Sequence, residues 1–134
     1  MIDHQSALLY TMVLVAAADA EMTDPELDKI GELVRYLPAF RGFDLRRIPE
    51  VTRACSALLQ DEDGLDKALE QIRDGLPRKL HETAYAVACD VAAANVQISQ
   101  EVLRLLEMIR HRLEIDRLVA AAIERGARAR HATA

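Results

Sequence analysis

Four carboxylates lie within one short stretch near the N-terminus, ADAEMTDPE at positions 18–26. Hard divalent cations of the Ca²⁺ or Mg²⁺ class bind where several carboxylate oxygens converge on one point. We therefore predict a divalent-cation site at this acidic turn, completed by acidic residues that the fold brings in from later in the chain. The candidate ligands are Asp19, Glu21, Asp24, Glu26, Asp90 and Glu101.

The same stretch also carries the start signal of a helix. Thr23 is a favoured N-cap residue, Pro25 is tolerated in the first turn, and Glu26 stands three residues after Thr23, as in a capping box. Under this alternative, Asp24 and Glu26 only satisfy and balance the helix N-terminus, and the two acidic residues before them are solvated. The sequence leaves both interpretations open.

Asp90 interrupts AYAVACDVAAAN, a stretch of otherwise small and mostly apolar side chains. A partly buried carboxylate there would serve as a metal ligand or as a proton acceptor in a small hydrolase. The alternative is that Asp90 lies on a solvated edge or pairs with an arginine, because buried carboxylates are rare. No spacing links serine, histidine and acidic residues into a catalytic set, and there is no glycine-rich phosphate-binding loop. We therefore expect a protein without enzymatic activity.

All the elements that position these carboxylates are predicted to be helices. Apolar residues recur at three- and four-residue spacings, and no alternating β-branched run predicts a strand. The fold class is therefore all-α, a single-domain bundle of about seven helices. Gly126 is expected to end the last helix, so that residues 1–126 form the domain and residues 127–134 form a frayed tail. The expected helices are Asp3–Ala18, Asp24–Leu37, Glu50–Leu59, Leu65–Leu76 and Arg78–Asn95, with a short turn at Leu45–Ile48. The next helix is capped by Ser99 and has Leu103, Leu106, Ile109 and Leu113 on its apolar face. The last helix has Ile115, Leu118, Val119, Ala122 and Ile123 on its apolar face.

Two of these helices are predicted to form the centre of the bundle. LLYTMVLV at positions 8–15 is apolar on nearly every side, which predicts burial all round. The helix Arg78–Asn95 has mostly small side chains in its second half, which let neighbouring backbones come close. The other helices have one apolar face each; in the second helix this face is Leu27, Ile30, Leu33, Val34 and Leu37.

The first helical hairpin recurs later in the chain. The sequence VAAA occurs twice, 76 residues apart, and the same shift places Asp19 on Asn95 and Thr23 on Ser99. One interpretation is two helical hairpins of similar build, nested so that their bends meet and acidic side chains face a shared gap. The other is that any two capped amphipathic hairpins align this well.

This repeated pattern resembles the TerB-like domains of bacterial tellurite-resistance and related proteins. The pattern is an alanine-rich helix end, an acidic turn, a hydrophobe, Ser or Thr, and an acidic helix start, here AADAEMTDPE at 17–26 and AANVQISQE at 93–101. The resemblance implies a compact helical cytoplasmic protein associated with tellurite resistance and stress response, whose acidic residues bind a metal ion and which has no established enzymatic activity. The family has Asp-Gly at each turn, whereas this chain has Asp19-Ala20 and Asn95-Val96.

The net charge and the cysteine content limit the classes of partner and site that we expect. The net charge of −5 disfavours nucleic acid or an anionic membrane as the main partner, because both require a basic face. The first apolar run is too short to span a bilayer and lacks a basic segment before it, so we expect a cytoplasmic protein with no direct membrane insertion. Cys55 and Cys89 have no ligand-spaced partners and are expected to be small core residues.

A second candidate surface holds most of the few aromatic residues. Tyr36, Pro38, Phe40 and Phe43 gather in one loop, where they form either a partner-binding patch or a plug at the end of the bundle. Taken together, we expect a non-enzymatic, stress-associated protein that binds a divalent cation or a protein partner through its acidic turn. The alternatives are a purely structural interaction module without a metal and a small hydrolase that uses Asp90.

Overall fold

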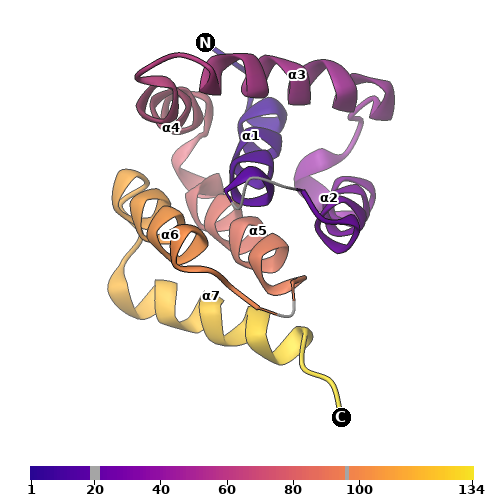
Figure 1. Cartoon of the computed structure of the whole chain (residues 1–134), viewed down its shortest axis with the longest axis vertical. Helices are drawn as coiled ribbons and strands as arrows, with labels where there is room; N and C mark the ends of the chain where they lie inside the picture. Colours follow the sequence, from indigo (N-terminus) through magenta and orange to yellow (C-terminus); the bar gives the residue numbers. More distant parts are fainter. Residues whose placement is uncertain (19–21, 96) are drawn as a thin grey trace.

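A computed structural model describes residues 1–18, 22–95 and 97–134, and within these ranges the chain is all-helical with no strand (Figure 1). The predicted all-α class is confirmed, and the seven α-helices pack into one bundle. The α-helices are α1 (His4–Ala17), α2 (Asp24–Tyr36), α3 (Ile48–Leu59), α4 (Gly64–Gly75), α5 (His81–Ala93), α6 (Gln100–Arg112) and α7 (Arg117–Arg130). The short 3₁₀ turns are η1 (Pro38–Phe40), η2 (Leu45–Arg47) and η3 (Arg78–Leu80).

Helix α1 is buried on every side, as its sequence predicts. All residues from Ser6 to Ala16 are buried, and the helix contacts α2, α3, α4, α5 and α6. The buried hydroxyl of Thr11 donates a hydrogen bond to the carbonyl oxygen of Ala7 at 2.8 Å, so this polar side chain is satisfied within the apolar run. Each fully buried Leu or Met side chain contributes about 1.5–3 kcal/mol to folding.

Helix α5 is the second central element, and its predicted position is confirmed. It packs against α1, α2, α6 and α7, and Figure 1 shows it between α1 and α7. Residues Ala84, Val87, Ala88 and Val91 are all buried. Because these side chains are small or compact, four neighbouring helices can approach α5 closely.

The helix starts that were predicted from cap residues are confirmed. Thr23 and Glu26 form the expected capping box at the start of α2. The side chain of Asp44 accepts from the amide of Arg46 at 3.0 Å, and that of Ser99 accepts from the amide of Val102 at 3.2 Å. Each cap satisfies a backbone donor that the first helical turn leaves without a partner.

The predicted end of the last helix at Gly126 is wrong. Helix α7 continues to Arg130, and Ala127 is buried against the bundle. A glycine inside a helix costs about 1 kcal/mol relative to alanine. Burial of Ala127 and an ion pair from Arg130 to Asp90 on α5 act in the opposite direction, and neither contact is visible in the local sequence.

Three leucines assigned to apolar faces are largely exposed instead. Leu27 is 47% exposed, Leu103 is 46% exposed and Leu118 is 80% exposed. In α7 the buried stripe runs through Ala120 and Ala127, because α5 can approach closely only where the side chains are small.

Two glycines provide a matched test of helix packing. A Cβ at Gly64 would clash with the carbonyl oxygen of Leu58 and lie 2.8 Å from the Cα of Leu59, whereas a Cβ at Gly31 would meet nothing within 4 Å. We expect Gly64→Ala to lower the free energy of unfolding by about 1–3 kcal/mol, since the clashing atoms are backbone. Gly31→Ala should raise it by about 0.5–1 kcal/mol.

Urea unfolding followed by circular dichroism measures both values. Equal effects of the two substitutions would contradict the close approach of α3 to the start of α4.

Candidate functional site

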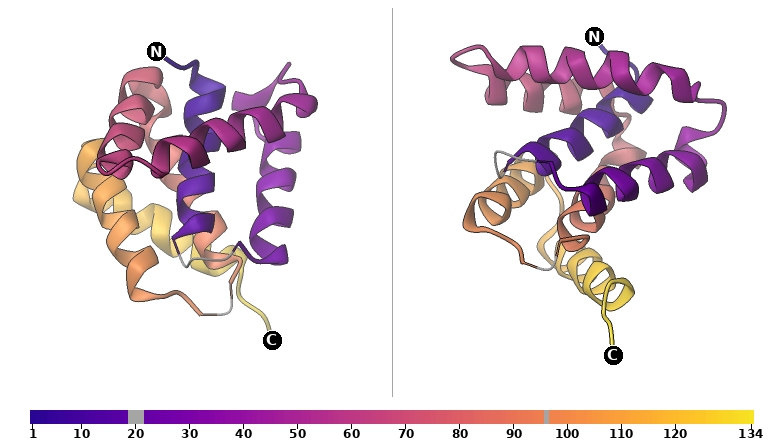
Figure 2. Two further views of the ribbon diagram at one scale, coloured as in Figure 1. Left: turned by 45° about the horizontal axis from the view of Figure 1, so that its top comes forward. Right: turned by 45° about the vertical axis from the view of Figure 1, so that its right-hand side comes forward.

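The two helical bends meet in space, as the repeated pattern predicts. The hydroxyl Oγ1 of Thr23, at the start of α2, lies 2.8 Å from the side-chain oxygen Oδ1 of Asn95, just after α5. Figure 2 shows the end of α1 and the start of α2 on the same side of the molecule as the end of α5 and the start of α6. The predicted ligands Asp19 and Glu21 lie outside the described residues.

Glu26 is the predicted ligand that the fold places at this junction. Its side chain is only 1% exposed, although it is the third residue of α2 and belongs to the capping box. One carboxylate oxygen, Oε1, lies 3.0 Å from both the amide nitrogen and the hydroxyl of Thr23. The other, Oε2, is buried and has no hydrogen-bond partner among the described residues.

The junction holds more hydrogen-bond acceptor oxygens than hydrogens that can be donated to them. The Thr23 hydroxyl carries one hydrogen, yet it lies within hydrogen-bond distance of both Glu26 Oε1 and Asn95 Oδ1. If the Asn95 amide is turned, its nitrogen donates to the hydroxyl, and Thr23 then donates to Glu26. In both arrangements Glu26 Oε2 is left without a donor. A cluster of hydroxyl, amide and carboxylate oxygens is the kind of ligand set that hard cations prefer.

Asp24 and Glu101 lie at the surface and act at helix starts. Asp24 is exposed in the first turn of α2, and Glu101 is exposed in the first turn of α6. Carboxylates at these positions interact favourably with the positive end of the helix dipole. Among the described residues, no three His, Cys, Asp or Glu side chains are grouped closely enough to hold a metal ion. The described part of the chain therefore contributes one carboxylate, Glu26, to the junction.

Asp90 pairs with an arginine, which is one of the arrangements that the sequence leaves open. Its Oδ1 accepts from Nη2 of Arg130 at 2.7 Å, and its side chain is 12% exposed. The pair links the middle of the bundle to the end of α7. Sequence analysis missed Arg130 because this arginine falls in the segment expected to fray.

Asn95 was identified only as the counterpart of Asp19 in the repeat, and its contact with Thr23 was missed. The signal was nevertheless present, because the alignment of the two hairpins places both residues at the same turn position. An asparagine amide in place of an aspartate carboxylate keeps an oxygen at the junction without adding charge.

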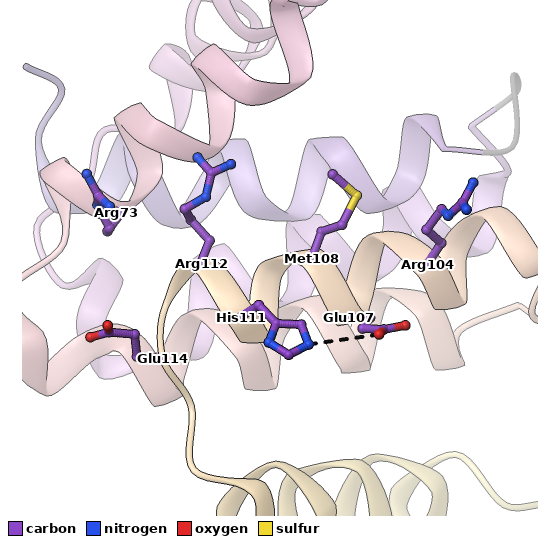
Figure 3. Close-up of a pocket in the computed structure, with 7 residues that line it drawn as sticks. All are labelled: Arg73, Arg104, Glu107, Met108, His111, Arg112 and Glu114. Carbon is purple, nitrogen blue, oxygen red and sulfur yellow. Dashed lines mark ion pairs between the residues drawn. The ribbon is translucent and has the colours of Figure 1, made fainter.

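A separate hollow of about 640 Å³ lies between α4 and α6 and is lined by several cations (Figure 3). Most of these cations have acidic partners. Arg112 pairs with Asp66 at 3.2 Å, Arg73 pairs with Asp74 at 3.4 Å, and His111 faces Glu107 at 3.8 Å. Because neighbouring carboxylates already offset its charge, this hollow is not an anion-binding cradle.

The aromatic loop divides between the two interpretations. Phe40 is buried and meets the ring of Phe43 edge-on at a centroid distance of 5.6 Å. The guanidinium of Arg47 lies 5.3 Å from the centre of the Phe43 ring, a cation–π contact. These two rings plug the end of the bundle, whereas Tyr36 is 78% exposed.

No protein-family model, no curated protein and no solved structure matches this chain. Among the described residues, no helix is both long enough and apolar enough to cross a membrane. A functional assignment must therefore rest on the chemistry of the junction and on the surfaces around it.

The two cysteines are expected to be unreactive in the folded protein. Both are free and buried, and burial raises the pKa of each thiol to about 12. At pH 8 only about one thiol in 10⁴ would then be the reactive thiolate. We expect Cys55 and Cys89 to react with a disulfide reagent at least about 100-fold more slowly in the native chain than in urea. Reaction of the native chain at the unfolded rate would contradict their burial.

Removing Arg130 is expected to leave a buried charge without its partner. We expect Arg130→Met to lower the free energy of unfolding by about 1–2 kcal/mol, since the arginine is half exposed and solvent screens part of the interaction. Adding Asp90→Asn should recover at least half of the loss, because the charge is then gone.

Arg128→Met is the matched control, since this exposed α7 arginine has no ion pair among the described residues. Chemical denaturation of all four proteins gives the comparison. A loss for Arg130→Met no larger than that for the control would argue against the pair.

Proposed function

We propose that this protein is a non-enzymatic binder of a divalent cation, held where its two helical bends meet. The observation that carries the proposal is the buried carboxylate of Glu26, with Oε2 unpartnered among the described residues. A buried carboxylate oxygen without a donor is costly, and a bound cation removes that cost. Thr23 and Asn95 supply neutral oxygens beside it.

Asp19 and Glu21 are proposed to complete the ligand set. They precede Thr23 by four and two residues, so the chain tethers both carboxylates close to the junction. Three carboxylates together with hydroxyl and amide oxygens suit a hard cation of the Ca²⁺ or Mg²⁺ class. A role in stress or tellurite resistance, which the TerB-like resemblance implies, would act through this site.

The burial of the second carboxylate oxygen of Glu26 supports cation binding at the junction rather than a purely structural role. A capping box needs only one oxygen of Glu26, and Oε1 already supplies it. The second oxygen could face water at no cost if the site had only a capping task. Instead it is buried without a donor among the described residues, so it is available as a ligand.

Isothermal titration calorimetry with Ca²⁺, Mg²⁺, Mn²⁺ and Zn²⁺ tests the proposal. We expect one ion to bind with one site per chain, and Asp19→Asn to weaken binding at least about tenfold, because affinity follows the charge of the ligand set. Glu26→Gln should weaken it similarly, and it keeps the capping box because glutamine also serves at that position.

Asp28→Asn is the control, since Asp28 is exposed on α2 and outside the junction. It removes the same charge as Asp19→Asn. Absence of binding by every ion, or equal binding by Asp19→Asn and the wild type, would rule out a cation site at these bends.

A further inference from the structure

An open groove lies on the face of the molecule opposite α3, between α6 and α7. Both helices pack on α5, on the side away from α3 (Figure 1). The hollow that residues of α5, α6 and α7 line has a volume of about 500 Å³. The alanines that line it include Ala92 and Ala93 of α5 and Ala120 and Ala127 of α7, and we call these four residues the alanine floor. Alanine side chains leave a shallow surface that another backbone can approach closely.

The walls of the groove carry apolar side chains that the bundle leaves exposed. Ile98 is 40% exposed and Leu103 is 46% exposed, and both line the groove. Exposed large hydrophobic residues that gather beside a hollow, rather than being scattered singly, mark an interaction surface.

The polar groups in the floor are already satisfied. The hydroxyl of Tyr85 donates to the carboxylate of Glu124, and burial together with this hydrogen bond raises the pKa of Tyr85. Cys89 is buried beside them, and burial raises the pKa of its thiol to about 12. These groups therefore present neither an unpaired donor nor a nucleophile to an incoming molecule.

The rim of the groove is cationic in a chain that is acidic as a whole. Arg110, Arg117 and Arg128 line it, and none of them has an ion pair in the part of the chain that the structure describes. Of the two carboxylates at the groove, Glu124 accepts from Tyr85 and Glu107 faces His111 at 3.8 Å. With three arginines and two glutamates, the ionisable side chains of the groove sum to a net charge of +1, whereas the whole chain carries −5.

We infer that this groove binds an amphipathic helix of a partner protein, with its apolar face on the alanine floor and acidic residues against the arginine rim. Binding of the apolar face of an amphipathic helix in a hydrophobic groove is a recurring mode of recognition. An open groove buries only one side of its occupant, whereas small-molecule sites enclose most of the ligand. Guanidinium groups pair with carboxylates in a bidentate manner, which favours acidic flanks over neutral ones. The inference is independent of the cation site.

Two synthetic peptides of about 18 residues provide the probes, long enough to form several helical turns. Both carry leucine and alanine on one face; the first has glutamate on the flanks and the second has lysine at the same positions. Fluorescence anisotropy should show binding of the glutamate peptide with a Kd of about 10–100 µM and at least about tenfold weaker binding of the lysine peptide. Binding of the glutamate peptide should weaken in 0.5 M salt, because salt screens the rim charges.

Charge reversal at the rim supplies the matched variants. The double substitution R117E/R128E should weaken the glutamate peptide at least about tenfold and strengthen the lysine peptide. The control R53E/R78E changes two exposed arginines elsewhere and should leave both affinities within about twofold. Ala121→Gln, at an exposed groove position, should lower affinity by bulk without changing charge.

Several outcomes would overturn the inference. They are equal binding of the two peptides, no binding of the glutamate peptide at about 1 mM, and an equal loss in the R53E/R78E control. Concentration-dependent dimerisation in sedimentation that R117E/R128E abolishes would assign the groove to a second copy of this chain. Binding to phosphatidylserine vesicles that the glutamate peptide does not displace would assign it to a membrane surface.

Discussion

The constraint on which the structure depends is the burial of α1 on every side. A short helix that is apolar all round cannot lie at a surface, so other helices must enclose it completely. Helices α2 to α6 all contact α1 in order to do so. Because α5 must lie alongside α1, the two hairpins that contain these helices come together, and so do their bends. The contact between Thr23 and Asn95 is therefore a consequence of how the core is closed.

That closure explains the unusual position of Glu26. A residue in the first turn of a helix normally faces solvent, where a carboxylate balances the helix dipole at little cost. Here Glu26 is only 1% exposed, and its hydrogen-bond partner Thr23 contacts Asn95 of the opposite bend. One oxygen caps the helix, and the other is buried without a donor among the described residues. The same packing that stabilises the bundle thus creates a negative, oxygen-rich junction. The cation-binding proposal follows from this buried acceptor oxygen without a donor.

The groove between α6 and α7 follows from the same architecture. Helix α5 has small side chains on several faces, so it can accept α1, α2, α6 and α7 together. Since α6 and α7 both pack on α5, the space between them has an alanine floor and exposed apolar walls. The bundle therefore holds two chemically distinct sites. One is the buried acidic junction at the bends, and the other is the open, arginine-rimmed groove between α6 and α7.

Local signals made the fold predictable from the sequence, whereas contacts between distant residues were not predictable from it. The apolar run of α1 and the Thr23–Glu26 capping box depend on neighbours within a few residues, and both are confirmed. The meeting of the bends was predictable because the hairpin recurs in the sequence. In contrast, Leu118 is exposed and Arg130 is anchored because of how α7 sits on α5. Spacing along one helix indicates its apolar face, as at Ile30 and Val34, but not which residues of that face a neighbouring helix covers.

Paramagnetic relaxation by Mn²⁺ tests the central claim most directly, since it reports where an ion sits rather than only whether it binds. In ¹H–¹⁵N spectra at substoichiometric Mn²⁺, the account predicts that the amide signals of Thr23, Glu26 and Asn95 broaden first, although Asn95 is far from the others in sequence, and that excess Mg²⁺ or Ca²⁺ restores them. Broadening that begins instead at the exposed acidic turn of residues 61–63, or that spreads evenly over the surface, would contradict a cation site between the two bends.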